Sequence, residues 1–172
     1  SASSCEVGDS AGRHVNFGGS GWSRPTSIDR QIALGAHLTS VSCASGTSFC
    51  AAVDWDGHTA FRVGSGWTMG GRLPEGVQGV SCPTSTFCLA LDRTGRSHRF
   101  DGTTWSRGPQ VSLVDVAVSC VSTTFCVAIG YGAASVYDGT RWSRPVAIDR
   151  ARRSPLESVA CATTTFCVVV ND

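Results

Sequence analysis

One cysteine-anchored segment recurs along the chain with a period of about forty residues. The clear copies read VSCASGTSFCAAVD (41–54), VSCPTSTFCLALD (80–92), VSCVSTTFCVAIG (118–130) and VACATTTFCVVVN (159–171). A fifth, degenerate copy, SSCEVGD, lies at 3–9. A repeat of this length with strand-forming sequence throughout is typical of the blades of a β-propeller, and not of a domain built around a single core.

Each repeat also carries turn signals at fixed spacing. In four repeats a glycine lies ten residues before a tryptophan, in the pairs Gly12 and Trp22, Gly57 and Trp67, Gly95 and Trp105, and Gly132 and Trp142. An aspartate stands three residues before the first three of these glycines. Aspartate caps the opening of a turn, and glycine accepts the positive φ that closes it. We therefore predict an all-β fold, a β-propeller whose blades are four-stranded and antiparallel.

The second strand of each unit is apolar at every position, as in AAV (51–53), LAL (89–91), VAI (127–129) and VVV (168–170). Such a strand is expected to be covered on both faces. The N-terminal copy breaks the pattern with Glu6 and Gly8, and burying Glu6 unpaired would cost roughly several kcal/mol. We therefore expect the C-terminal strand around Cys167 to complete the first blade, whose other strands come from 11–30. The ring would then close by pairing of the N- and C-terminal segments, with 1–8 as a displaced or edge segment.

The length of 172 residues corresponds to about four blades, which we treat as one domain, 1–172. A closed four-bladed monomer is the first expectation. The sequence leaves two alternatives open. One is a homodimer in which two chains complete an eight-bladed ring, and the other is a fragment of a longer propeller.

The cysteines are expected to pair within each repeat. Paired cysteines flank turns of five or six residues between antiparallel strands, where opposite Cα atoms lie ~4.5–5.5 Å apart, and zinc-site spacing and partner histidines are missing. The predicted disulfides are Cys43–Cys50, Cys82–Cys88, Cys120–Cys126 and Cys161–Cys167. Because reducing cytosol would not maintain four such bridges, we expect a secreted, extracellular protein. Cys5 is left over, as a free thiol or an intermolecular link.

The composition limits the partners. Charged residues make up 16% of the chain, the net charge is +1, and all fourteen basic residues are arginines. Because these arginines are scattered and nearly balanced by acids, a nucleic-acid partner is not expected. No apolar run approaches the ~20 residues of a membrane-spanning helix, so no membrane span is expected.

The repeat VSC-x-S-x-T-FC-x-A-x-D, followed by YDG-x-x-WS-x-P and then ID, covers nearly the whole chain. It resembles the cysteine-paired repeat of secreted actinobacterial β-propellers. The resemblance implies the propeller architecture and defines no active site. A propeller of this kind acts on a metalloprotease, so the resemblance also implies a protein-binding propeller that modulates an extracellular protease.

A search for catalytic groups finds little. His14, His37, His58 and His98 fall at different phases of the repeat, and we expect each to be a turn or surface residue. No G-x-S-x-G elbow presents a nucleophilic serine. A glycosidase would need two carboxylates at a set separation, but Glu6, Glu75 and Glu157 lie off the repeat and the repeated aspartates serve turns. We expect no catalytic residue, no metal site and no cofactor, and a glycosidase is the least favoured alternative.

Binding is expected on one face of the propeller. If the strands alternate in direction, the Asp-Gly turns and the links between blades share one face, and the Cys and Gly-Trp turns share the other. The two longest links, WSRPTSIDRQIALGAH and WSRPVAIDRARRSPLE, are near copies. Long loops on a rigid scaffold often carry recognition, and arginine suits carboxylate, phosphate or sugar hydroxyl groups. The candidate binding residues on these links are Asp29, Arg30, Asp149, Arg150, Arg152 and Arg153.

Trp55 is a separate candidate. It lies off the repeat register in the turn 54–57, on the face of the links, where an aromatic flanked by carboxylates suits a sugar ring or a protein partner. The four repeated tryptophans are expected to pack between blades. Arg24, Arg107 and Arg144, each two residues after such a tryptophan, could line repeated pockets.

The sequence therefore predicts a secreted, disulfide-pinned, non-catalytic recognition module. A lectin-like, carbohydrate-binding propeller is favoured because repeated blades give multivalent sites that combine polar and aromatic groups. The alternative is the protein-binding propeller that modulates an extracellular protease.

Overall fold

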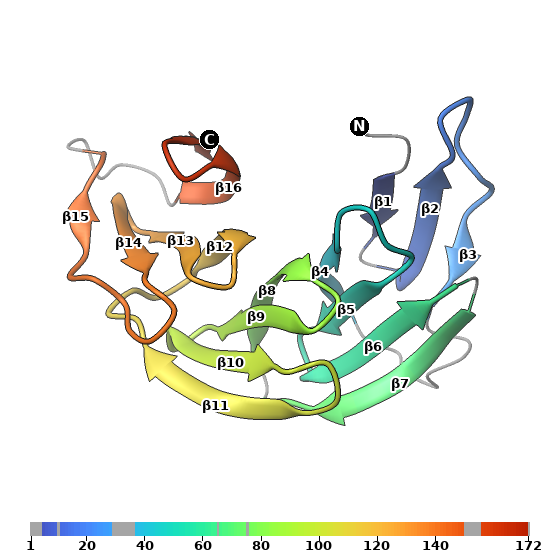
Figure 1. The fold of residues 1–172 in the computed structure, drawn as a ribbon, viewed down its shortest axis with the longest axis horizontal. Coiled ribbons are helices and arrows are strands. Elements are labelled where there is room, and N and C mark those ends of the chain that lie inside the picture. Colours follow the sequence, from blue (N-terminus) through green and yellow to red (C-terminus); the bar gives the residue numbers. More distant parts are fainter. Residues whose placement is uncertain are drawn as a thin grey trace.

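A computed structural model describes residues 5–9, 11–28, 37–64, 66–74, 76–149 and 156–171. These residues form strands and turns only, arranged as five antiparallel sheets that follow one another along an arc (Figure 1). Within this part of the chain no helix is long and apolar enough to cross a membrane. The predicted all-β propeller with four-stranded antiparallel blades is confirmed.

The five sheets are called blades 1 to 5 in chain order. Blade 1 consists of β1 (Cys5–Gly8), β2 (Arg13–Phe17) and β3 (Thr26–Ser27). Blade 2 consists of β4 (Leu38–Cys43), β5 (Cys50–Asp54), β6 (His58–Val63) and β7 (Gly66–Arg72). Blade 3 consists of β8 (Val77–Thr84), β9 (Phe87–Asp92), β10 (Arg96–Phe100) and β11 (Trp105–Gln110). Blade 4 consists of β12 (Ala117–Ser122), β13 (Phe125–Gly130), β14 (Ala133–Tyr137) and β15 (Val146–Ala147). Blade 5 consists of β16 (Leu156–Thr163) and β17 (Phe166–Asn171).

The first strands of blades 2 to 5 lie innermost, and a ladder of serines joins them. The serine of each V-S-C segment accepts a hydrogen bond from the backbone N–H of a cysteine in the next inner strand. That cysteine directly follows the residue at the serine's own repeat position. The three bonds join Ser42 to Cys82 (2.9 Å), Ser81 to Cys120 (2.9 Å) and Ser119 to Cys161 (3.0 Å). The V-S-C sequence therefore ties each blade to the next one. In β16 the segment reads V-A-C, and Ala160 has no hydroxyl to continue the ladder.

The turns follow the predicted chemistry. The glycines that close the Asp-Gly turns have positive φ, as at Gly57 and Gly95, and a Cβ at either position would overlap a backbone carbonyl oxygen of the following link. At the other end of the blade, Asp101 opens a turn and accepts hydrogen bonds from the backbone N–H of Thr104 and from the Thr103 hydroxyl. These bonds hold the pKa of Asp101 well below its ordinary value.

The second strands of the middle blades are buried on both faces. Every residue of β5 and β9 is buried, as are all residues of β13 after Phe125. The prediction from continuous apolar sequence is confirmed for these strands and is wrong for 168–170 in β17, where Val168 and Val170 are exposed. Between blades 2 and 3, the rings of Phe49, Phe61, Phe100 and Trp105 form a continuous stack.

All four predicted disulfides are present, and each joins the first two strands of one blade. Cys5 is a free, exposed cysteine in the described part of the chain.

The predicted closure of the ring by the C-terminal strand is wrong. Residues 5–8 form β1, which pairs with β2 in the register Cys5 to Phe17 and Gly8 to His14. Strand β17 pairs with β16 and with no other described strand. Blades 1 and 5 lie on opposite sides of the opening in the arc (Figure 1).

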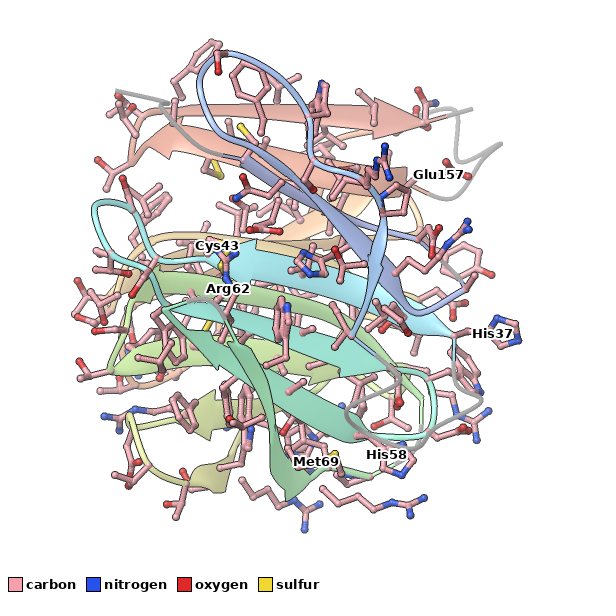
Figure 2. The ribbon with its side chains drawn as sticks, turned by 90° about the vertical axis from the view of Figure 1, so that its right-hand side faces the viewer. His37, Cys43, His58, Arg62, Met69 and Glu157 are labelled. Carbon is pink, nitrogen blue, oxygen red and sulfur yellow. A yellow bond between two sulfur atoms is a disulfide. The ribbon has the colours of Figure 1, made fainter. Side chains whose placement is uncertain are left out.

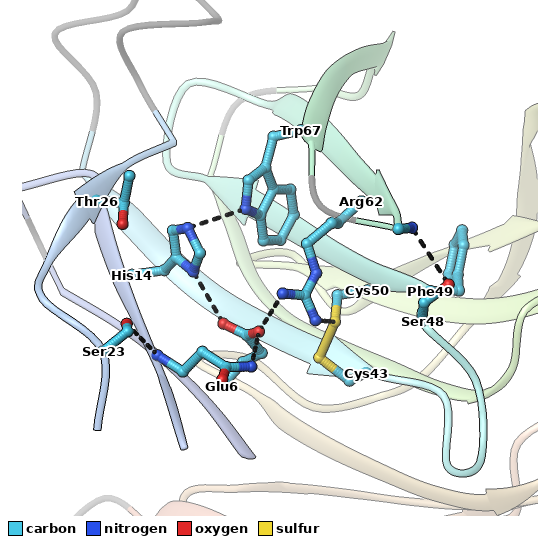
Figure 3. A network of polar contacts seen from close by, with 12 residues as sticks. Glu6, His14, Ser23, Thr26, Cys43, Ser48, Phe49, Cys50, Arg62 and Trp67 are labelled. Carbon is cyan, nitrogen blue, oxygen red and sulfur yellow. Dashed lines mark hydrogen bonds and ion pairs between the residues drawn. A yellow bond between two sulfur atoms is a disulfide. The ribbon is translucent and has the colours of Figure 1, made fainter. Parts of the chain in front are cut away.

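The reason is that Glu6 is buried together with its partners (Figure 3). Its Oε1 lies 2.5 Å from Nη1 of Arg62 and accepts a hydrogen bond from Nδ2 of Asn16 at 2.9 Å. Its Oε2 lies 2.9 Å from Nδ1 of His14. The indole N–H of Trp67 donates to Nε2 of His14 at 3.3 Å, so Nδ1 carries the proton that is donated to Glu6. Blade 2 supplies Arg62 and Trp67, so this network joins blade 1 to blade 2.

Both sides of the opening expose apolar side chains. On β17, Phe166, Val168 and Val170 are 60%, 48% and 53% exposed, whereas the matching side chains of β9 are buried. On blade 1, Trp22 is 57% exposed. The expectation that all four repeated tryptophans pack between blades is therefore wrong for Trp22, since no described blade covers that side of blade 1.

Candidate functional site

The Asp-Gly turns and the links between blades lie together on one face, which is called the link face. The backbone N–H of Trp55 donates to the carbonyl of His37 (3.1 Å), and the N–H of Gly76 donates to the carbonyl of Trp55 (2.6 Å). On the opposite face, the N–H of Gly64 donates to Oγ of Ser48, which joins a Gly-Trp turn to a Cys turn (3.2 Å). His37, His58 and Glu157 point to the same side of the molecule (Figure 2). The structure thus has the two faces that the alternation of strand direction predicts.

The link face has a cavity of about 450 Å³ where the inner strands begin. It is lined by Trp55, whose side chain is 44% exposed, and by residues from the starts of four blades. The polar groups in the lining include Thr39, Gln78, Asp115 and Glu157. The cavity therefore combines an exposed indole with two carboxylates, and it is called the Trp55 cavity.

Gln78 positions one of these carboxylates. Its Nε2 donates to Oδ1 of Asp115 at 3.2 Å, and its Oε1 accepts the backbone N–H of Val116 at 2.8 Å. Asp115 has a φ of 50°, in the left-handed region that aspartate tolerates better than most residues. Gln78 thus holds the Asp115 carboxylate at the rim of the cavity while one carboxylate oxygen stays without a bond to a described residue.

A second cavity of about 370 Å³ continues between the inner strands β4, β8, β12 and β16. It shares Thr39, Gln78, Ala117 and Glu157 with the Trp55 cavity, and its lining includes several serines of the inner strands. The Trp55 cavity therefore adjoins a second, polar cavity between the inner strands.

Tyr131 is an exposed aromatic residue that the sequence analysis missed. It lies in the turn after β13, at the repeat position that Trp55 occupies after β5, and it is 57% exposed. Its φ is 39°, which is strained for a bulky side chain. The signal was present in the sequence, but the turn of this repeat is one residue shorter, which hides the equivalence to Trp55.

The predicted link residues are only partly described. Asp29, Arg30, Arg150, Arg152 and Arg153 lie outside the described residues. The backbone N–H of Asp149 donates to the carbonyl of Gly132 at 3.0 Å, which anchors the start of the second long link.

The three repeated arginines do not gather at one place. Arg24 and Arg144 are exposed in blades 1 and 4. Arg107 lines a different cavity, between blades 2 and 3, and none of the three lines the Trp55 cavity.

The expectation that all four histidines are turn or surface residues is wrong for three of them. Each of the three has a largely buried side chain that is paired with a carboxylate. His14 bonds to Glu6, as described above. His58 Nδ1 lies 3.0 Å from Oδ2 of Asp54, and the buried His98 lies 3.1 Å from Oδ2 of Asp92 through its Nε2. The repeat pattern did not reveal these pairs. Two of them set a turn aspartate against a histidine of the following strand, and the third joins His14 of β2 to Glu6 of β1.

The Asp92 pair is held by its turn. Burial raises the pKa of Asp92, but hydrogen bonds from the Thr94 hydroxyl, from His98 and from backbone N–H groups outweigh burial and lower it. The carboxylate is therefore charged and fully used in structural bonds. Among the described residues, no group of three or more His, Cys, Asp or Glu side chains could hold a metal ion.

A scan against protein-family models and a search of curated proteins found no match. Solved structures match in fold. One, described as "YCF48 bound to D1 peptide", is 15% identical with a TM-score of 0.66 over 93% of this chain. Another, "YCF48 from Cyanidioschyzon merolae", is 14% identical with a TM-score of 0.71 over 98% of this chain. The chain spans 54% and 63% of these two proteins, and the likeness establishes the β-propeller fold alone.

Proposed function

We propose that this chain is an extracellular, non-catalytic recognition propeller that binds a protein partner on its link face. In this proposal the Trp55 cavity receives a basic side chain of the partner. The observation that carries the proposal is the exposed indole of Trp55, which shares one cavity with the carboxylates of Asp115 and Glu157.

The chemistry of the cavity favours a cation. An indole face attracts a cation by about 0.5–1 kcal/mol at an exposed site and by about 2 kcal/mol when the site is desolvated. The carboxylates of Asp115 and Glu157 add the opposite charge at the same cavity. An arginine or lysine side chain is the protein group that satisfies both, and tryptophan is among the residues that dominate protein interfaces.

Two further observations support a protein partner outside the cell. A solved propeller of the same fold is described as bound to a peptide. The four disulfides favour an oxidising compartment, and hence secretion. The resemblance of the repeat to secreted actinobacterial propellers makes an extracellular protease the first class of partner to test.

A lectin-like function is the second candidate, and Trp55 is also the observation that favours it. An exposed indole beside carboxylates can stack on a sugar ring while the carboxylates accept hydroxyl hydrogen bonds. The charge of the ligand separates the two candidates. A protein partner would place a cationic side chain in the Trp55 cavity, whereas a sugar ligand can be neutral.

The test is a selection of short random peptides on the oxidised protein, followed by affinity measurements on the enriched peptides. We expect them to contain arginine or lysine, and we expect Trp55→Ala to weaken binding by about tenfold or more. The matched control is Trp22→Ala, which removes another exposed tryptophan, from a Gly-Trp turn of blade 1, and should leave the affinity unchanged.

A glycan array on the same protein completes the test. Binding to a related set of neutral sugars that is lost in Trp55→Ala would replace the protein-binding proposal with the lectin. Peptides that bind equally well to Trp55→Ala and to the wild-type protein would remove Trp55 from the site.

A further inference from the structure

A separate cavity of about 590 Å³ lies between blades 2 and 3, outward from the Trp55 cavity. Its walls come from the end of β7 and the residues after it, from the turn between β9 and β10, and from β10 and β11. Four arginines line it, namely Arg72, Arg93, Arg96 and Arg107. It is called the arginine cavity.

The described lining contains one carboxylate, and that carboxylate is already used. Asp92 is buried, and its oxygens accept hydrogen bonds from His98 and from the Thr94 side chain and backbone. Glu75, which follows Pro74 in the sequence, lies outside the described residues. The described cations of the cavity therefore outnumber its free anions.

The guanidinium groups are also incompletely bonded. Arg72 donates to the backbone carbonyl of Asp56 at 3.2 Å, and Arg96 donates to the carbonyl of Gly108 at 3.4 Å. Arg93 and Arg107 are exposed, and no described residue accepts a hydrogen bond from their guanidinium groups or pairs with them. Their donor groups are free to bind a ligand.

The shape of the cavity suits a ligand that has an apolar stem. Leu73, Pro74 and the indole of Trp105 lie in the same lining as the arginines. A carboxylate fits the planar fork of a guanidinium through two parallel hydrogen bonds. Glutamate side chains carry such a group on an apolar stem, which matches both parts of the lining.

The two cavities are neighbours on the link face. The backbone of Gly76 bonds to Trp55 on one side and to Arg93 on the other, through hydrogen bonds of 2.6 and 2.8 Å. Trp55 lines the inner cavity and Arg93 lines the outer one. An extended polypeptide that crosses Gly76 would therefore meet both.

We infer that the arginine cavity is a binding site for the carboxylates of an acidic polypeptide segment. This site is distinct from the Trp55 cavity and does not depend on it, because it has its own lining and the opposite charge. Since the net charge of the whole chain is only +1, general attraction to polyanions is weak and a local site is needed to explain tight binding.

The experiment measures binding of a fluorescent hexaglutamate peptide by anisotropy, with hexaglutamine as the neutral comparison. We expect saturable binding of hexaglutamate, and a loss of affinity of about tenfold or more in the double variant Arg93→Gln, Arg107→Gln. Both arginines are exposed, and their guanidinium groups bond to no described residue. The variant should therefore fold, and thermal unfolding checks that it does.

Arg144→Gln is the matched control, because Arg144 occupies the repeat position of Arg107 in blade 4 and does not line the arginine cavity. It should bind hexaglutamate as the wild-type protein does. Trp55→Ala should also retain this binding, which separates a failure of this inference from a failure of the proposed function.

Three results would overturn the inference. They are no saturable binding of hexaglutamate, equal loss of affinity in Arg144→Gln and in the double variant, and tighter binding of inorganic phosphate than of hexaglutamate. The last result would mark a site for a small oxyanion rather than for an acidic polypeptide.

Discussion

At the scale of single residues, buried charges hold the first blade in place. The Glu6 side chain is 3% exposed and the Arg62 side chain is 16% exposed, and they pair across the interface of blades 1 and 2. In an environment with little water, an ion pair of this kind is costly to break because the remaining charge stays buried. Glu6 therefore fixes β1 in blade 1, although a glutamate in an apolar position is at first sight evidence against burial.

Replacing Glu6 tests this account. Glu6→Gln should lower the free energy of unfolding by about 3 kcal/mol, since Arg62 keeps its charge and loses its partner. Arg141→Gln, which removes an exposed ion pair with Asp138, should leave it nearly unchanged, because water and salt screen such a pair. Urea denaturation of the oxidised proteins measures both values. Similar small effects would mean that residues 5–8 do not occupy blade 1 in solution.

At the scale of strands, the blades are held together by the serine ladder and pinned internally by the disulfides. A short disulfide-closed loop contributes roughly 2 kcal/mol on the entropic model, and each disulfide acts within one blade. The ladder acts between blades, since each serine hydroxyl accepts an N–H of the next inner strand. The V-S-C segment thus provides both kinds of link. Its serine forms the hydrogen bond between blades, and its cysteine forms the disulfide within a blade.

Removing one rung should have a measurable cost. Ser81→Ala leaves the backbone N–H of Cys120 without its acceptor, and we expect the free energy of unfolding to fall by about 1–3 kcal/mol. Ala160→Ser is the matched control, because it adds a hydroxyl at the same repeat position of blade 5, where the residue is exposed, and should be nearly neutral. If Ser81→Ala is also neutral in thermal and urea unfolding, the ladder does not stabilise the contact between blades 3 and 4.

At the scale of the whole molecule, the described residues form an open arc in which blades 1 and 5 each lack a neighbouring blade on one side. Val127 in β13 and Val168 in β17 occupy the same repeat position, yet Val127 is 7% exposed and Val168 is 48% exposed. Burial at this position therefore depends on a neighbouring blade, not on the residue type. The homodimer that the sequence left open remains a proposal at this scale.

These two valines provide a test of the open arc. Val127→Ala should cost about 2 kcal/mol, from the lost methyl groups and the cavity left behind, whereas Val168→Ala should cost less than about 0.5 kcal/mol. Denaturant unfolding at several protein concentrations gives both values. Equal costs would show that β17 is covered in solution, by the first blade or by a second chain.

The parts of the fold that repeat were predictable from the sequence. Turn residues, the pairing of Cys82 with Cys88, and the burial of Leu89 follow from local pattern and spacing. The parts that depend on one particular contact were not. Glu6 can be buried because Arg62 of the neighbouring blade pairs with it. Trp22 is exposed because no described blade covers its side of blade 1. The equivalence of Tyr131 to Trp55 was hidden because the turn of that repeat is one residue shorter. At the candidate site, the sequence indicated Trp55 and its face, but not the carboxylate of Asp115 beside it.

The most direct measurement of the central claim is the titration of a selected basic peptide into the protein, followed by NMR through the indole N–H signals. The chain has five tryptophans, and the variant Trp55→Phe assigns the signal of interest. The account predicts that the Trp55 signal shifts with the fraction of peptide bound while the Trp22 signal stays in place. A Trp55 signal that does not move while the peptide binds would place recognition elsewhere and contradict the account.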